Sequence, residues 1–182
     1  MLFISMKITA RALKNLIREA SVAGGALKER PWSLEYSFKL SGGIASDAEG
    51  KGPDGFAINL KGESGNVLRV MVDSYWNPQA GDKSGNSLKV VLNGEPVEGG
   101  ETYVPVRFDD GKQQFIQISN SPTARVICIS HTGDEDSPPV VYLAVPNPFE
   151  DEEELDVETE ELGNGDAEVK LHRQVNLLYK FV

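Results

Sequence analysis

The sequence predicts a mainly β protein, a β-sandwich or jelly-roll-like domain with a short N-terminal amphipathic helix. Three observations support this fold class. Apolar and polar residues alternate with a period of two in several short segments, which is typical of half-buried strands. Turn-forming sequences separate these segments, and the chain contains 18 Gly and 10 Pro. Its 182 residues are enough for one domain with a core of its own.

An N-terminal helical arm is predicted over residues 1–30, with the helix itself at residues 9–20. Thr9 is a suitable N-cap for this helix. Its apolar stripe has the spacing i, i+3, i+4, i+7 and consists of Leu13, Leu16, Ile17 and Ala20. Because so short a helix is marginal alone in water, we expect the stripe to bind its own domain, another copy or another protein.

The β-sandwich domain is predicted over residues 31–149. Alternation from Trp32 to Leu40 gives its first strand and places Trp32 in the core. Further strands are expected at 56–60, 67–72, 88–92, 103–108, 114–118, 125–130 and 140–145. Asn93-Gly94 is a strong hairpin signal because both residues tolerate positive φ. Asp109-Asp110-Gly111 is a second hairpin candidate, joining 103–108 to 114–118.

The last part of the chain combines an acidic segment with a final strand. Residues 150–161 hold nine acidic side chains, so residues 150–168 are expected to be a solvated acidic linker. Apolar alternation resumes over 169–182 and predicts a C-terminal strand, long or bent at Arg173. This strand would complete the protein's own sheet or a neighbouring one. Its expected partner-binding residues are Val175, Leu177, Tyr179 and Phe181.

The net charge of −10 is distributed unevenly. Residues 1–31 carry six Lys or Arg against two Glu, whereas residues 150–182 carry eleven Asp or Glu against three Lys or Arg. This distribution argues against a nucleic-acid binder, which would need a broad basic surface. The sequence has no apolar run near the ~18 residues of a membrane span and no secretory signal peptide. We therefore expect cytoplasmic synthesis and no membrane or nucleic-acid partner.

Residues 6–20 contain Met6-Lys7, an amphipathic helix and the sequence Ile17-Arg18-Glu19-Ala20. They resemble the leaders of internal head proteins in contractile-tailed bacteriophages, which end in a hydrophobe-x-Glu processing site. Five residues precede Met6, which departs from that pattern unless Met6 is the true start. The resemblance implies capsid targeting and cleavage between Glu19 and Ala20.

Together with the two contact-forming ends, this resemblance favours a non-enzymatic structural or assembly protein. Such a protein would be a phage virion component, which means a capsid, decoration or tail protein. Its partners would be other copies of itself or other virion proteins.

Residues suited to catalysis or metal binding are few. Cys128 lies in an apolar run and is expected to be a small core residue. It is three residues from His131, so a strand would place the two on opposite faces. His131, Asp134 and Asp136 could form an acid–base or metal site only if they converge. His172 is expected to face solvent. We predict no catalytic site, no metal site and no cofactor.

Tyr75, Trp76 and Asn77 support an alternative hypothesis, a carbohydrate- or ligand-binding β-sandwich module. Aromatic rings can stack on sugar rings while amides bind hydroxyls, although aromatic residues also fill sandwich cores. The three residues are expected where a strand meets a long loop, a position that often carries recognition. A glycan is the partner that this hypothesis predicts.

Overall fold

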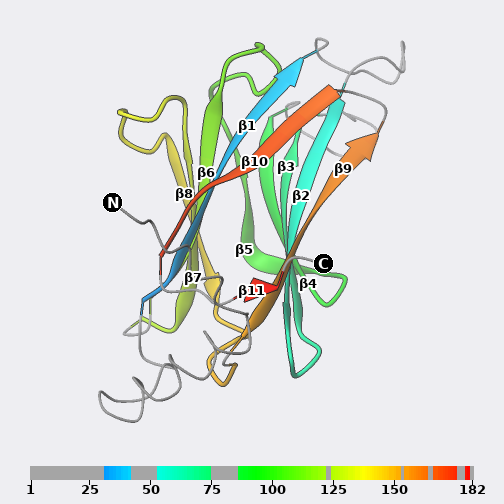
Figure 1. Cartoon of the computed structure of the whole chain (residues 1–182), viewed down its shortest axis with the longest axis vertical. Helices are drawn as coiled ribbons and strands as arrows, with labels where there is room; N and C mark the ends of the chain where they lie inside the picture. Colours follow the sequence, from blue (N-terminus) through cyan, green and yellow to red (C-terminus); the bar gives the residue numbers. More distant parts are fainter. Residues whose placement is uncertain are drawn as a thin grey trace, which may run out of the picture.

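Eleven β-strands in two stacked sheets make up the part of the chain that the structure describes (Figure 1). The structure is a computed structural model. It describes residues 31–41, 53–74, 86–121, 124–152, 154–163, 166–175 and 179–180. The predicted mainly β sandwich is confirmed, whereas the predicted helix at 9–20 lies outside these residues. Within the described ranges, no helix has the length and apolar character needed to cross a bilayer.

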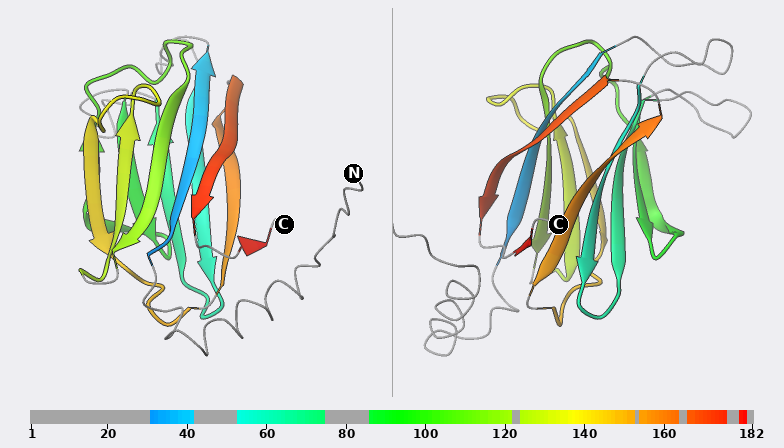
Figure 2. Two further views of the ribbon diagram at one scale, coloured as in Figure 1. Left: turned by 60° about the vertical axis from the view of Figure 1, so that its left-hand side comes forward. Right: turned by 45° about the vertical axis from the view of Figure 1, so that its right-hand side comes forward.

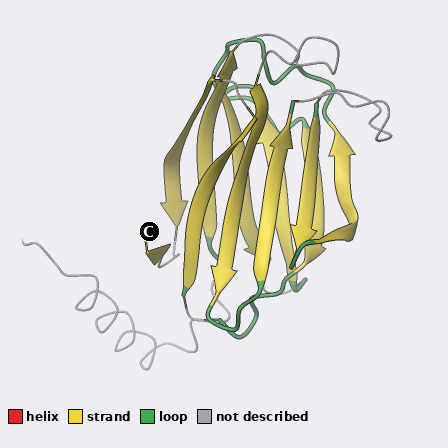
Figure 3. Cartoon of the chain, turned by 90° about the vertical axis from the view of Figure 1, so that its right-hand side faces the viewer, coloured by secondary structure: helices red, strands yellow, loops and turns green. Residues whose placement is uncertain are grey.

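The two sheets differ in size and strand order. The five-stranded sheet has the order β10-β1-β6-β7-β8, and the six-stranded sheet has the order β11-β9-β2-β3-β4-β5. The bounds are β1 Ser33–Ser41, β2 Pro53–Gly62, β3 Val67–Asp73, β4 Ser87–Leu92, β5 Glu95–Tyr103, β6 Gln114–Ser121, β7 Val126–Thr132, β8 Val141–Pro146, β9 Leu155–Gly163, β10 Asp166–Val175 and β11 Tyr179–Lys180. The axes of the strands in the two sheets are roughly aligned (Figure 3).

The core lies between the sheets and is built from the apolar half of each alternating strand. The buried apolar side chains of β1 and β2 include Leu34, Tyr36, Phe38, Leu40, Phe56, Ile58 and Leu60. The ring of Phe38 lies 5.0 Å from that of Phe56 and 5.9 Å from that of Phe108, measured between centroids. Burial of each such side chain contributes about 1.5–3 kcal/mol. Trp32 is half-buried at the edge of this core.

The acidic segment is not a linker over most of its length, which corrects the prediction for residues 150–168. Residues 155–163 form β9, which pairs antiparallel with β2. Leu155 and Val157 are buried in the core. On the opposite face, the carboxylate of Glu158 lies 3.1 Å from Lys61 Nζ and that of Glu160 lies 2.6 Å from Arg69 Nη1. Neighbouring strands therefore supply cations that offset part of the repulsion within this acidic strand.

The C-terminal strand completes the protein's own sheet. β10 pairs antiparallel with β1, and its register shifts so that Glu35 opposes Arg173 while Tyr36 opposes Leu171. His172 is left between these pairs as a β-bulge, next to the expected bend at Arg173. The strand begins at Asp166, earlier than predicted, and the short β11 pairs parallel with β9 in the other sheet.

The predictions of a strand at 103–108 and of a hairpin at Asp109–Gly111 are wrong. The strand is β5, Glu95–Tyr103, which follows the Asn93-Gly94 turn and pairs with β4. Residues 104–113 instead cross from one sheet to the other. The apolar residues of this segment include Val104 and Phe108, and both are buried against the core. The spacing of apolar residues in this connecting segment is therefore the same as in a half-buried strand, although the segment is not one.

Glu152 holds the tight turn between β2 and β3. Its carboxylate accepts hydrogen bonds from the backbone N–H of Glu63 (2.8 Å) and of Ser64 (3.0 Å). Partial burial acts to raise the pKa of Glu152, but the hydrogen bonds from Ser64 and Glu63 outweigh it and lower the pKa below its ordinary value. The ionised carboxylate is therefore the form that the turn binds.

We expect Glu152→Ala to lower the free energy of unfolding by about 1 kcal/mol, because two N–H donors of the turn lose their acceptor. Glu168→Ala is the matched control, since this carboxylate only joins an exposed pair with Lys170 and should cost less than about 0.5 kcal/mol. Urea unfolding of both variants measures the difference. Equal losses would show that Glu152 does not support the turn.

Candidate functional site

Most of the residues that the sequence singles out lie outside the described part of the chain. These are Leu13, Leu16, Ile17, Glu19, Ala20, Tyr75, Trp76, Asn77, Leu177 and Phe181. The backbones of Val175 and Tyr179 belong to β10 and β11, where they pair with Ser33 and Leu155. The predicted contact and processing roles of these residues therefore stay predictions.

His131 belongs to the core and not to a loop site. It is fully buried, and its Nε2 lies 2.7 Å from the side-chain oxygen of Gln114. The rings of Phe38 and Phe108 lie beside it, and its Nδ1 has no hydrogen-bond partner within the described residues. Burial lowers the pKa of His131 to about 4, so the imidazole is neutral in the folded protein near pH 7.

The hypothetical acid–base site at His131, Asp134 and Asp136 is therefore not formed. Whereas His131 points into the core, Asp134 accepts hydrogen bonds from the backbone N–H of Asp136 (3.2 Å) and the hydroxyl of Ser137 (2.7 Å). The Asp134 carboxylate is thus occupied within the loop that joins β7 to β8, and Asp136 contributes its backbone N–H. In the described ranges, no group of three or more His, Cys, Asp or Glu side chains is arranged to hold a metal ion.

Cys128 is not a core residue, which corrects its expected position. The inward face of β7 carries Ile127, Ile129 and His131. Cys128 lies on the opposite face of the strand and is half-buried with a free thiol. The expectation that Cys128 and His131 lie on opposite faces is confirmed.

The loop that joins β7 to β8, residues 133–140, lies at one end of the five-stranded sheet (Figure 2). A small recess lies beside this loop on the outer face of the sheet. We call it the outer-face recess. Its volume is about 170 Å³, and its lining residues are Glu35, Phe115, Gln117, Ser130, Thr132, Asp134, Glu135, Ser137 and Pro139. Strands β1, β6 and β7 form its floor, and the loop forms its wall.

Two contacts hold the loop over the sheet. At one end the backbone N–H of Val140 donates to the carbonyl of His131 (2.7 Å). Further along, Glu135 Oε1 lies 3.1 Å from Nε2 of His172 on β10. The His172 ring packs edge-on against Phe115, with 5.3 Å between centroids. His172 is thus on the outer surface, as expected, and it fixes both the loop and the aromatic floor.

The lining of the outer-face recess is chemically mixed. Ser130 and Thr132 offer hydroxyls, and Gln117 offers an amide, so donors and acceptors are both present. Glu35, Asp134 and Glu135 add carboxylate acceptors. Such a set can bind a ligand that is rich in hydroxyl groups.

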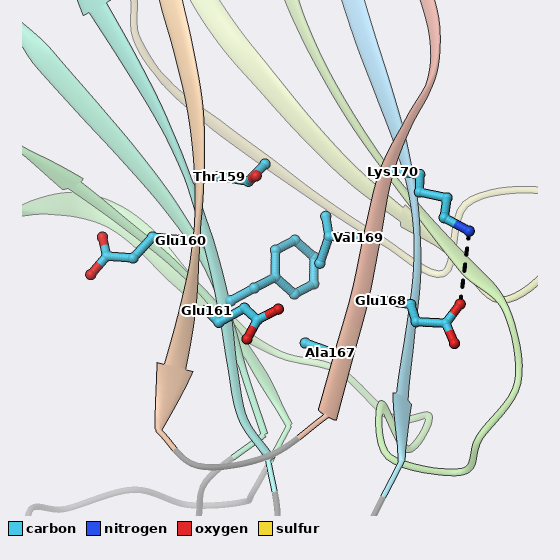
Figure 4. A pocket seen from close by; sticks show the side chains of 8 residues that line it. Thr159, Glu160, Glu161, Ala167, Glu168, Val169 and Lys170 are labelled. Atoms are coloured by element: carbon cyan, nitrogen blue, oxygen red, sulfur yellow. Dashed lines mark ion pairs between the residues drawn. The ribbon is translucent and has the colours of Figure 1, made fainter. Parts of the chain in front are cut away.

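A second, larger recess opens between β9 and β10, where the two sheets diverge (Figure 4). Its volume is about 500 Å³, and its lining residues are Phe56, Thr159, Glu160, Glu161, Ala167, Glu168, Val169 and Lys170. Glu160 points away from it toward Arg69. Glu168 and Lys170 also point away and pair with each other at 3.9 Å. With Phe56 fully buried, this cleft presents no aromatic surface to solvent.

Comparisons with known proteins show similarity at the level of the fold. No family model matches the sequence, and no curated protein matches it. Peanut lectin, solved with a nine-residue peptide, superposes with a TM-score of 0.53 and 14% identity, covering 78% of this chain and 68% of that chain. Metal-free lectin I-B4 from Griffonia simplicifolia gives 0.51 and 16%, covering 78% and 69%. The described strands therefore form a lectin-like β-sandwich.

Proposed function

We propose that this protein is a non-enzymatic carbohydrate-binding β-sandwich module. The observation that carries the proposal is the fold that 78% of the chain shares with two lectins. The outer-face recess supports it, because hydroxyls, an amide and carboxylates line one small hollow on the outer face of the sheet. Hydrogen bonding to sugar hydroxyls requires this mixture of donors and acceptors.

The comparisons give no support to the phage virion role that the sequence favoured. The leader-like residues 6–20 lie outside the described residues, so their processing and targeting stay predictions. A structural role also gives no account of the outer-face recess. Carbohydrate binding is therefore the better supported of the two hypotheses.

The intact protein is expected to bind at least one oligosaccharide on a glycan array, with a dissociation constant between about 1 μM and 1 mM, because small recesses of this kind give modest affinity. Titration calorimetry with the best array ligand measures the constant. Absence of binding to every glycan on the array would refute the proposed function.

A further inference from the structure

The largest exposed side chain of apolar character in the described chain lies beside the outer-face recess. Two large hydrophobic residues are exposed among the described ranges, Tyr142 at 67% and Val140 at 38%. Val140 directly follows Pro139, which lines the recess. Tyr142 pairs on β8 with Ser130 of β7, which also lines it. Each exposed residue is therefore next to a residue that lines the recess, Val140 in the sequence and Tyr142 in the strand register, although neither lines it.

Strand geometry places Tyr142 on the same face of the sheet as that recess. Side chains of directly paired residues lie on the same face of a sheet, with Cβ atoms about 5 Å apart. Tyr142 and Ser130 therefore share the outer face, and the exposed tyrosine is the direct cross-strand neighbour of a residue that lines the recess. An exposed aromatic ring next to hydroxyl and amide groups is suited to a pyranose, whose C–H face packs on the ring while its hydroxyls form hydrogen bonds.

The charge of the lining restricts the class of sugar. Glu35, Asp134 and Glu135 line the recess, and its lining includes no lysine or arginine. Two basic residues border it: His172, whose Nε2 lies 3.1 Å from Glu135 and 3.9 Å from Glu35, and Arg173, which opposes Glu35 in the strand register. The three carboxylates outnumber these two residues. A uronate, sialate or sulfate group would meet these carboxylates and be repelled. Neutral and amino sugars avoid this repulsion.

We propose that the outer-face recess, with Tyr142 as its aromatic platform, is the binding site for saccharides that carry no acidic group. The proposal rests on the proposed carbohydrate-binding function and locates its site. Tyr142 supplies the stacking surface, and Gln117, Ser130 and Thr132 supply the hydrogen bonds. This site differs from residues 75–77, which the sequence alone suggests.

The test uses the full chain and four probes that share one chain length: neutral gluco- and galacto-oligosaccharides, a glucosamine oligosaccharide and an oligogalacturonate. Calorimetry compares the wild type with Tyr142→Ala, Tyr142→Phe and Trp76→Ala. Tyr142→Ala should weaken binding of the neutral or amino sugar at least about tenfold, because removal of an aromatic ring that packs on a ligand typically costs binding on this scale. Tyr142→Phe should bind like the wild type, since it keeps the ring. Trp76→Ala should also bind like the wild type.

The outcomes distinguish failure of the proposed site from failure of the proposed function. If the wild type binds no probe and no arrayed glycan, the proposed function fails and the site fails with it. If the wild type binds and Tyr142→Ala binds equally well, the site is wrong while the function stands. Loss of binding in Trp76→Ala alone would move the site to residues 75–77. Preference for the oligogalacturonate would overturn the assigned sugar class. An unchanged thermal midpoint of Tyr142→Ala confirms that the fold is intact.

Discussion

Gly55→Ala is expected to lower the free energy of unfolding by about 3 kcal/mol or more. Gly55 lies on β2 with φ of +114°, a conformation that residues with a side chain rarely adopt. A Cβ atom here would lie 1.8 Å from the carbonyl oxygen of Val72 on β3. Because that atom is backbone, the clash can be relieved only by separating the two strands beside the buried Phe56. The loss therefore combines backbone strain with damage to the core.

Gly65→Ala is the matched control for this substitution. Gly65 also has a positive φ, +90°, but a Cβ atom there meets nothing within 4 Å. Its replacement should cost only the backbone strain, about 1–2 kcal/mol. Urea unfolding of both variants isolates the steric part as their difference. If the two losses are equal, contact with Val72 does not determine the requirement for glycine.

Much of the sandwich can be predicted because local patterns determine its strands. Alternation from Trp32 to Leu40 gives β1 within one residue at each end. Asn93 and Gly94 form the predicted turn, with φ values of 52° and 88°. Both signals depend on the period of two and on the steric freedom of turn residues. Neither needs any knowledge of the partner strands.

β9 could not be predicted in the same way, because its stability depends on residues distant in the sequence. Taken alone, residues 155–163 combine two buried apolar side chains with a series of like charges that repel each other. Lys61 and Arg69, more than 90 residues earlier in the chain, compensate part of this repulsion once β2 and β3 lie alongside. Sequence patterns show the repulsion but not the compensating cations.

The outer-face recess was missed for a related reason. Gln117, Ser130 and Thr132 occupy the polar half of their strands, a position that any surface residue can fill. They become a site only because β1, β6 and β7 are neighbours and the β7–β8 loop folds back to reach His172. Tyr142 lies in a predicted strand, but its exposure depends on which face of β8 meets the core.

Lowering the pH from 7 to 5 is expected to reduce the free energy of unfolding by about 2 kcal/mol through His131 alone. Its pKa is about 4 in the folded protein and 6.5 in the absence of burial. Below pH 6.5 the unfolded chain therefore takes up a proton that the folded protein does not accept until about pH 4. The contribution to stability is complete above pH 6.5 and is lost as the pH falls from 6.5 to 4. The lowered pKa values of Glu152 and Glu160 act mainly below pH 4.5, outside the measured interval from pH 7 to pH 5.

His131→Gln and His131→Phe isolate this effect. Both replacements lack a titrating group, so their free energy of unfolding should change by less than about 0.5 kcal/mol between pH 7 and pH 5. The glutamine amide can still donate to the side-chain oxygen of Gln114, whereas phenylalanine leaves that buried oxygen without a donor. His131→Phe should therefore be less stable than His131→Gln by about 1–3 kcal/mol at both pH values. Urea unfolding at pH 7 and pH 5 separates the two terms: the slope with pH reports the imidazole, and the constant offset reports the hydrogen bond. A variant that kept the wild-type loss between these pH values would assign it to groups other than His131.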